Sequence, residues 1–148
     1  MLGSPHGGCL PDISMWSPQR QEGHTRIAGP AYTVHFVRRG TEPSTIKEHY
    51  IDSVPAGTVI FISAPPDAAN AVYGGLMSHR AKVSGAVGAV VDGRIRDLQD
   101  HRDLVYPVNV PVTVRVEDQD MTIRPGDYII GDLNGVVCIP LELISAQG

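Results

Sequence analysis

The chain has 148 residues, of which 42% are hydrophobic and 19% charged, and its formal net charge is −4. These values suit one globular domain and argue against the basic surface that binds nucleic acid or acidic membranes. No apolar run approaches a membrane span, and residues 1–10 lack the pattern of a signal peptide. We therefore expect a cytoplasmic protein without membrane contact or direct nucleic-acid binding. Cys9 and Cys138 have no metal-binding spacing, so we expect both to be free, buried thiols.

The first half of the chain predicts a loop and two strands. Residues 1–23 lack periodicity and contain several prolines and glycines, which indicates an ordered loop. Residues 27–37 alternate apolar and polar side chains toward their end, as a strand does, and residues 38–49 are polar enough for an exposed loop. Residues 51–63 contain a turn and then the apolar run T-V-I-F-I-S, which predicts a buried strand. Residues 64–69 would be a connection, with a first helical turn as an open alternative.

The centre of the chain predicts a helix followed by a strand. The double glycine Gly74-Gly75 opens a helix-like run over residues 76–84. Gly85 stands where a glycine commonly ends a helix in the left-handed conformation. Residues 86–91 then form an apolar run of strand length.

Charged residues follow this strand closely. Asp92 and Gly93 form a turn signal, and Arg96, Asp97 and Asp100 come just beyond it. Two carboxylates can hold a hard cation, while an arginine and the backbone N–H groups at a helix start can bind an anion. The segment therefore predicts a site for a small dicarboxylate. From these residues alone, a solvated loop that caps the next short helix is an open alternative, and the double glycine could serve only close packing.

The last third predicts strands and turns. Residues 110–116 alternate as a strand, and residues 124–127 read R-P-G-D, a turn. Residues 128–131 and 136–139 flank an Asn-Gly pair at 134–135, which is a strong hairpin signal. With no internal repeat or linker, the strand–helix–strand centre and the later hairpins favour one mixed α/β domain.

Other polar residues have simpler interpretations. His79 and Arg80 lie within the predicted helix and would be surface or subunit contacts. His101 and its charged neighbours indicate a solvated face, and Asp127 and Asp132 stand at strand ends as turn residues.

The central segment resembles the family of the regulator of ribonuclease activity A (RraA). The resemblance rests on G-G-L-M-x-x-x-A-x-x-x-G-A-V-G-x-V-V-D-G-x-x-R-D followed by Y-P-V. The segments P-H-G-G-C-L-P-D-I, G-P-A-Y-T-V and R-P-G-D-x-I-x-G-D-x-N-G-V-V-x-I-P also resemble the family, especially its fungal members. The resemblance implies an α/β fold of the swivelling β/β/α type, similar to phosphohistidine domains, in one domain over residues 1–148. It also implies a homotrimer with sites between subunits, and a chain shortened at both termini and after Val108.

The resemblance implies roles for the charged residues. In the family's aldolases the arginine of the R-D pair contacts substrate and the aspartate binds a divalent metal. The resemblance places these two roles at Arg96 and Asp97 in this chain. The best-known aldolases carry a further aspartate at the position of Gly75. A variant pattern has glycine there and an acid three residues after the R-D aspartate, which Asp100 fits. The backbone donors to a substrate carboxylate would come from Gly74, Gly75, Leu76 and Met77.

The implied activity is that of a divalent-metal lyase acting on a small 2-oxo dicarboxylate. Aldol cleavage of 4-hydroxy-4-methyl-2-oxoglutarate and decarboxylation of oxaloacetate both leave a pyruvate enolate, whose oxygen needs positive charge as it forms. Oxygen ligands at Asp97 and Asp100 suit Mg²⁺ or Mn²⁺. The alternative is a non-catalytic protein-binding module, such as a regulator of an RNA-degrading enzyme, which would not need the charged triplet.

Overall fold

The computed structural model describes residues 7–16, 23–38, 40–41, 48–101, 112–116, 119–132 and 135–145. The first half contains β1 (Cys9–Leu10), β2 (Ile27–His35), the 3₁₀ helix η1 (Tyr50–Ser53), β3 (Val59–Ser63), α1 (Gly75–Val83) and β4 (Gly88–Asp92). The second half contains α2 (Leu98–His101), β5 (Val112–Val116), β6 (Gln119–Ile123), β7 (Tyr128–Asp132), β8 (Gly135–Ile139) and α3 (Leu141–Ser145).

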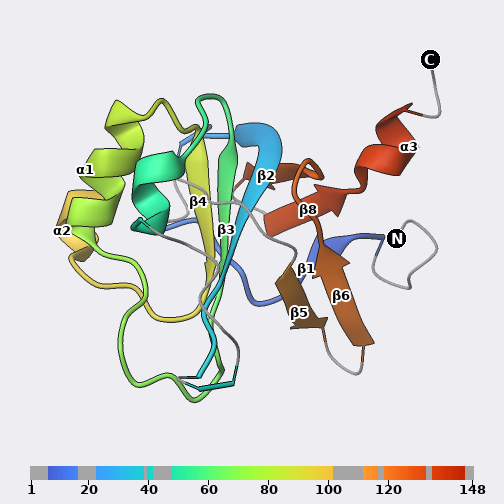
Figure 1. The fold of residues 1–148 in the computed structure, drawn as a ribbon. Helices are drawn as coiled ribbons and strands as arrows, with labels where there is room; N and C mark the ends of the chain where they lie inside the picture. Colours follow the sequence, from blue (N-terminus) through green and yellow to red (C-terminus); the bar gives the residue numbers. More distant parts are fainter. Residues whose placement is uncertain are drawn as a thin grey trace.

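These elements form three layers, as Figure 1 shows. The helices α1, α2 and η1 lie on one side of the parallel strands β2, β3 and β4, and the β-hairpins lie on the other side. The described strands form a mixed sheet in the order β1-β8-β7-β2-β3-β4, with β5-β6 as a separate pair. This arrangement confirms the predicted α/β fold with β/β/α layers.

Strand β2 joins the two parts of the mixed sheet. Its first residues pair antiparallel with β7, where Ile27 lies opposite Gly131. Its later residues pair parallel with β3, where Ala31 lies opposite Val59. Because one strand serves both partners in succession, the sheet turns from the hairpin layer into the parallel layer along β2.

Strand β3 is the centre of the core, as its apolar run predicts. Val59 and Phe61 belong to the core between the strand layers, whereas Ile60 and Ile62 pack under the helices. All four side chains are fully buried, because β3 has a strand on each edge and a layer on each face.

Helix α1 connects β3 to β4 and ends as the sequence indicates. Gly85 has φ of +80°, its N–H donates to the Lys82 carbonyl, and the Ala86 N–H donates to the Ala81 carbonyl. These two bonds are the Schellman pattern, which a glycine at this position favours. The predicted helix over 76–84 is therefore confirmed to within one residue at each end.

Several local predictions need correction. The N-terminal loop contains strand β1, which pairs with β8 through sequence-distant contacts. The connection at residues 64–69 contains a turn closed by the Ala68 N–H and the Pro65 carbonyl, not a helical turn. The last hairpin pairs Asp132 with Gly135, so Gly135 belongs to β8 and not to the predicted turn; residues 133–134 lie outside the described residues.

Other predictions have mixed outcomes. Cys9 and Cys138 are free thiols, but Cys9 is exposed, because successive side chains of β1 alternate and Leu10 takes the side that faces the core. Only Cys138 is buried as expected. Most of the predicted exposed loop at 38–49 and the junction after Val108 lie outside the described residues. Within the described part of the chain, no helix is long and apolar enough to cross a membrane.

Candidate active site

The site is built where the segment before α1 pairs with the segment after β4. Tyr73 and Ile95 form a parallel bridge, and the Arg96 N–H donates to the Tyr73 carbonyl at 3.0 Å. The Val72 N–H also donates to the Arg94 carbonyl, at 2.9 Å. These bonds bring the double glycine at the start of α1 beside Arg96 and its neighbours, although more than twenty residues separate them in sequence.

Asp97 caps the N-terminus of α1 from this second segment. The Gly75 N–H donates to Asp97 Oδ2 at 3.0 Å, while Gly74, the residue at the N-cap position, has no side chain that could do so. The N–H groups of Leu76 and Met77 are also in the first turn, where helix geometry gives them no intrahelical acceptor. A second anion can therefore bind there, next to the carboxylate of Asp97.

Both glycines are needed because side chains of the site approach their backbone closely. A Cβ at position 74 would lie 2.9 Å from Asp97 Oδ2 and 3.0 Å from Arg96 Nε. A Cβ at position 75 would overlap Asp100 Oδ2 and lie 2.8 Å from Asp100 Cβ. Asp100 thus fills the space that a side chain at position 75 would enter, and the double glycine admits the charged residues rather than apolar packing.

Asp97 has a strained backbone. Its φ is +60°, in the left-handed region, which costs a non-glycine residue on the order of 1–2 kcal/mol, somewhat less for aspartate. Asp97 immediately precedes α2, and the Asp100 N–H donates to its carbonyl. Since its carboxylate bonds to Gly75, it caps α1 and not α2. The alternative that Arg96 and Asp97 only cap the next helix therefore does not describe the observed contact.

A cleft of about 570 Å³ opens at this helix start. The predicted substrate-binding residues that line it are Gly74, Leu76, Met77 and Arg96. Asp97 and Asp100 are not among its described lining residues, so they lie beside the cleft. The Arg96 guanidinium is 3.6 Å from Asp97 Oδ2 and its side chain is 70% exposed. An exposed pair of this kind is a weak tether, so Arg96 can turn toward a ligand in the cleft.

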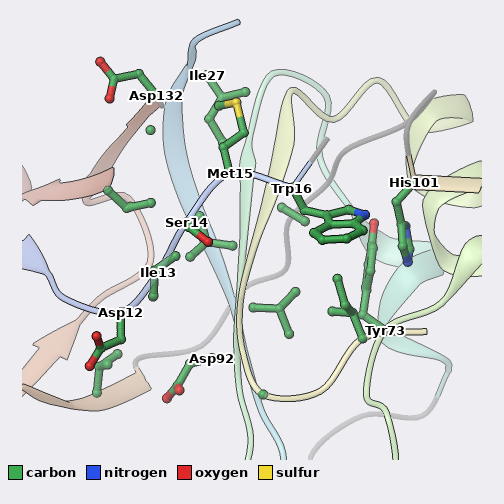
Figure 2. A pocket seen from close by; sticks show the side chains of 18 of the residues that line it. Asp12, Ile13, Ser14, Met15, Trp16, Ile27, Tyr73, Asp92, His101 and Asp132 are labelled. Atoms are coloured by element: carbon green, nitrogen blue, oxygen red, sulfur yellow. The ribbon is translucent and has the colours of Figure 1, made fainter. Parts of the chain in front are cut away.

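Tyr73 also lines a second cavity, of about 490 Å³, which Figure 2 shows. Trp16, Tyr73 and His101 lie together at one end of it, and Asp12 and Asp92 lie at the other. Burial raises the pKa of Asp92, which is half-buried at the end of β4. The turn signal at Asp92 did not indicate this partial burial.

The prediction of a solvated His101 is wrong. His101 is 4% exposed, and its ring stacks on Tyr73 with centroids 5.3 Å apart. It is the buried residue of α2, whose other three residues are exposed. This burial was hard to predict from the sequence, because a four-residue helix is too short to show a periodic buried face.

The predictions for the other polar residues agree more closely with the structure. His79 and Arg80 are exposed on α1, and Arg80 pairs with Asp52. Asp127 is a turn residue as predicted, but it is buried, where it accepts from the N–H groups of Arg124 and Leu141. Asp132 ends β7 and is half-buried.

The two carboxylates of the site suit a hard divalent ion that takes its remaining ligands from water and substrate. Within the described ranges, no group of three or more His, Cys, Asp or Glu side chains could hold a metal. Asp97 and Asp100 are two carboxylates that approach the same pair of glycines. Mg²⁺ is commonly held by one or two carboxylates plus water and substrate oxygens, so these residues fit it better than they fit a fully protein-ligated Zn²⁺.

The comparisons with known proteins agree on one family. The family signature described as RraA-like, Aldolase/RraA, matches residues 11–138. A protein of Halalkalibacterium halodurans, provisionally named a 4-hydroxy-4-methyl-2-oxoglutarate aldolase, is 35% identical over 133 residues. That match covers 78% of this chain but only 60% of the relative, so the chain spans less than two thirds of its length.

Two further matches cover most of the chain. The 4-hydroxy-4-methyl-2-oxoglutarate aldolase of Thermus thermophilus is 23% identical, over 92% of this chain and 87% of that protein. The crystal structure of Streptomyces coelicolor RraAS2, described as an unusual member of the RNase ES inhibitor RraA protein family, superposes with a TM-score of 0.72. It is 24% identical and the match covers 98% of this chain and 78% of that one, which supports the fold alone.

Proposed function

The chain belongs to the RraA-like family, and from that premise we propose that it is a divalent-metal-dependent lyase of small 2-oxo dicarboxylates. The reaction breaks a C–C bond and releases pyruvate, as in cleavage of 4-hydroxy-4-methyl-2-oxoglutarate or decarboxylation of oxaloacetate. Relatives named as aldolases support the aldolase class. The metal, the oxaloacetate activity and the residue roles are part of the proposal.

One observation carries the proposal: Arg96, Asp97 and Asp100 all approach the glycine start of α1. Asp97 accepts from the Gly75 N–H, and Asp100 fills the space beside Gly75. In the family's best-known aldolases, a carboxylate would project from position 75 itself. Here Asp100 brings a carboxylate to the same place from α2, so the site keeps two acids.

The residues divide the chemistry between them. Asp97 and Asp100 would hold Mg²⁺ or Mn²⁺, and the bound ion would supply positive charge at the keto oxygen as the enolate forms. The N–H groups of Leu76 and Met77 bind the carboxylate next to the keto group. Arg96 binds the substrate in the cleft and offsets the negative charge of the enolate with its planar guanidinium.

The proposal includes a homotrimer with sites between subunits. On α1, Leu76 is 73% exposed and Val83 is 89% exposed, so this helix offers apolar surface to a neighbouring copy. Light scattering that gives only the monomer mass would contradict the trimer.

The test is a pyruvate-release assay on the purified chain with oxaloacetate or 4-hydroxy-4-methyl-2-oxoglutarate as substrate, in the presence of Mg²⁺, before and after chelation. Metal-catalysed decay without protein is subtracted. Asp97→Asn should weaken Mg²⁺ affinity in calorimetry and abolish turnover. Arg96→Lys should leave metal affinity nearly unchanged and lower kcat by about 10²–10³, the usual effect of losing one transition-state donor.

Asp52→Asn is the matched control, since Asp52 pairs with the exposed Arg80 outside the site. It should have wild-type metal affinity and turnover. If Asp97→Asn also behaves as wild type, the metal assignment is wrong. If the wild-type chain releases no pyruvate from either substrate, the non-catalytic binding module is the better function.

A further inference from the structure

His101 links the two segments that form the site. Its Nδ1 lies 2.5 Å from Ser78 Oγ on α1, and its Nε2 lies 2.6 Å from the Arg96 carbonyl oxygen. Ser78 is fully buried, and its own N–H donates to the Gly74 carbonyl to close the first turn of α1. One imidazole ring therefore connects the first turn of the helix to the peptide between Arg96 and Asp97.

The chemistry of the Arg96 carbonyl fixes the direction of its bond to the ring. The Arg96 carbonyl can only accept, so Nε2 carries a proton and donates to it. In the neutral ring Nδ1 is then an acceptor, and the Ser78 hydroxyl donates to it. Both ring nitrogens and the hydroxyl proton are thus satisfied in one arrangement of a neutral histidine.

These bonds close a ring of contacts around the charged residues. The Arg96 N–H donates to the Tyr73 carbonyl, and the Gly75 N–H donates to Asp97 Oδ2. His101 holds the carbonyl side of Arg96 and also stacks on Tyr73. Both polar groups of the Arg96 backbone therefore have fixed partners, and the next residue is Asp97 with its positive φ.

We propose that His101 is a positioning residue, which holds the Arg96–Asp97 peptide so that Asp97 keeps its left-handed conformation and its bond to Gly75. A strained residue persists only where surrounding contacts fix it. The exposed side chains of Arg96 and Asp97 are weak restraints on each other. The bond from His101 to the Arg96 carbonyl is a stronger one, because it is partly buried and its imidazole is only 4% exposed. The effect of His101 on turnover rests on the function proposed above, but its effect on the Asp97 conformation does not.

Two amide variants separate the two bonds of the ring. The nitrogen of glutamine in His101→Gln can occupy the place of Nε2 and still donate to the Arg96 carbonyl. The shorter side chain in His101→Asn can reach only the Ser78 side. Both changes replace an aromatic ring with a polar amide, so loss of packing against Tyr73 is common to both. A difference between them reports on the bond to Arg96.

The first readout needs no substrate. Hydrogen exchange at the Gly75 and Arg96 amides should be at least tenfold faster in His101→Asn than in the wild type, but within about threefold of it in His101→Gln. The Ile60 amide, in the central strand, is the reference for global opening. Equal exchange in the two variants, or an unchanged Gly75 amide in His101→Asn, would overturn the proposal.

The second readout is turnover with oxaloacetate and Mg²⁺. His101→Asn should lower kcat by on the order of 10–100-fold with little change in KM, as expected for small displacements of reacting groups. His101→Gln should recover most of that loss. If the wild type is inactive, the proposed function fails, while the exchange experiment still decides the role of His101. Equal kcat in both variants, with an active wild type, would contradict positioning through Arg96.

Discussion

The close approach of Asp100 to Gly75 makes Gly75→Ala an informative perturbation. The added Cβ would overlap Asp100 Oδ2 and lie 2.8 Å from Asp100 Cβ and 2.9 Å from its Cγ. A short side chain cannot relieve three such contacts by rotating its end alone. We therefore expect Asp100 and the start of α2 to move away from the helix, which separates the two carboxylates.

Two opposing terms set the effect on stability. Alanine is favoured over glycine within a helix by about 0.5–1 kcal/mol. Forcing an extra methyl group into a packed position typically costs about 1–3 kcal/mol. The free energy of unfolding should therefore change by between roughly zero and 2.5 kcal/mol toward instability. Metal affinity should fall much more clearly, by on the order of 10–100-fold, because a ligand is displaced.

The assay pairs urea unfolding with a calorimetric Mg²⁺ titration on Gly75→Ala, Asp100→Gly and the double variant. Asp100→Gly removes the three atoms nearest to the new methyl, so the overlap should vanish in the double variant. The coupling free energy of this cycle should lie in the range of about 0.5–3 kcal/mol found for residues in contact. Additive effects on stability, together with wild-type metal affinity in Gly75→Ala, would refute the reasoning. Gly75→Asp combined with Asp100→Gly, which moves the acid to α1, should regain part of the affinity.

Two further predictions concern the rest of the fold. Burial, with the nearby Asp127 carboxylate, raises the pKa of Cys138 to about 12 from 9.0. The buried neutral thiol therefore stabilises the fold fully below pH 9, and this stabilisation is lost as the pH rises toward 12. A thiol reagent should titrate Cys9 alone in the native chain and both cysteines after unfolding, and Cys138→Val should flatten the alkaline loss of stability. Gly85→Ala should lower the free energy of unfolding in urea by about 1–2 kcal/mol because φ is +80°, whereas Gly85→Asn should lower it less. Equal losses in the two variants would mean that the left-handed conformation is not the cause.

The parts of the fold that sequence could predict are those with a local signal. The apolar run of β3 is long enough to indicate burial on both faces, and Gly85 marks the end of α1 by a rule that involves only its own turn. The charged triplet and the double glycine were also visible, because their residue types are unusual at those spacings. Each of these inferences uses fewer than ten neighbouring residues.

The missed features depend on contacts between distant segments. The burial of His101 follows from the bridge between Tyr73 and Ile95, which brings α2 against α1. The capping of α1 by Asp97 follows from the same bridge, and β1 exists only because β8 is there to pair with it. No periodicity within these short segments could have predicted their partners.

The charges at the start of α1 also argue for a divalent ion in the proposed reaction. Arg96 contributes +1 and the helix N-terminus about +0.5, while Asp97 and Asp100 contribute −2, so the local sum is about −0.5. Asp97 already binds the first N–H of the helix, which reduces what the N-terminus can offer a second anion. Such a site would bind a dicarboxylate dianion poorly. With a divalent cation on the two acids the sum becomes about +1.5, which favours the substrate and the enolate together. We therefore expect dicarboxylate affinity to depend on the metal even before any bond is broken.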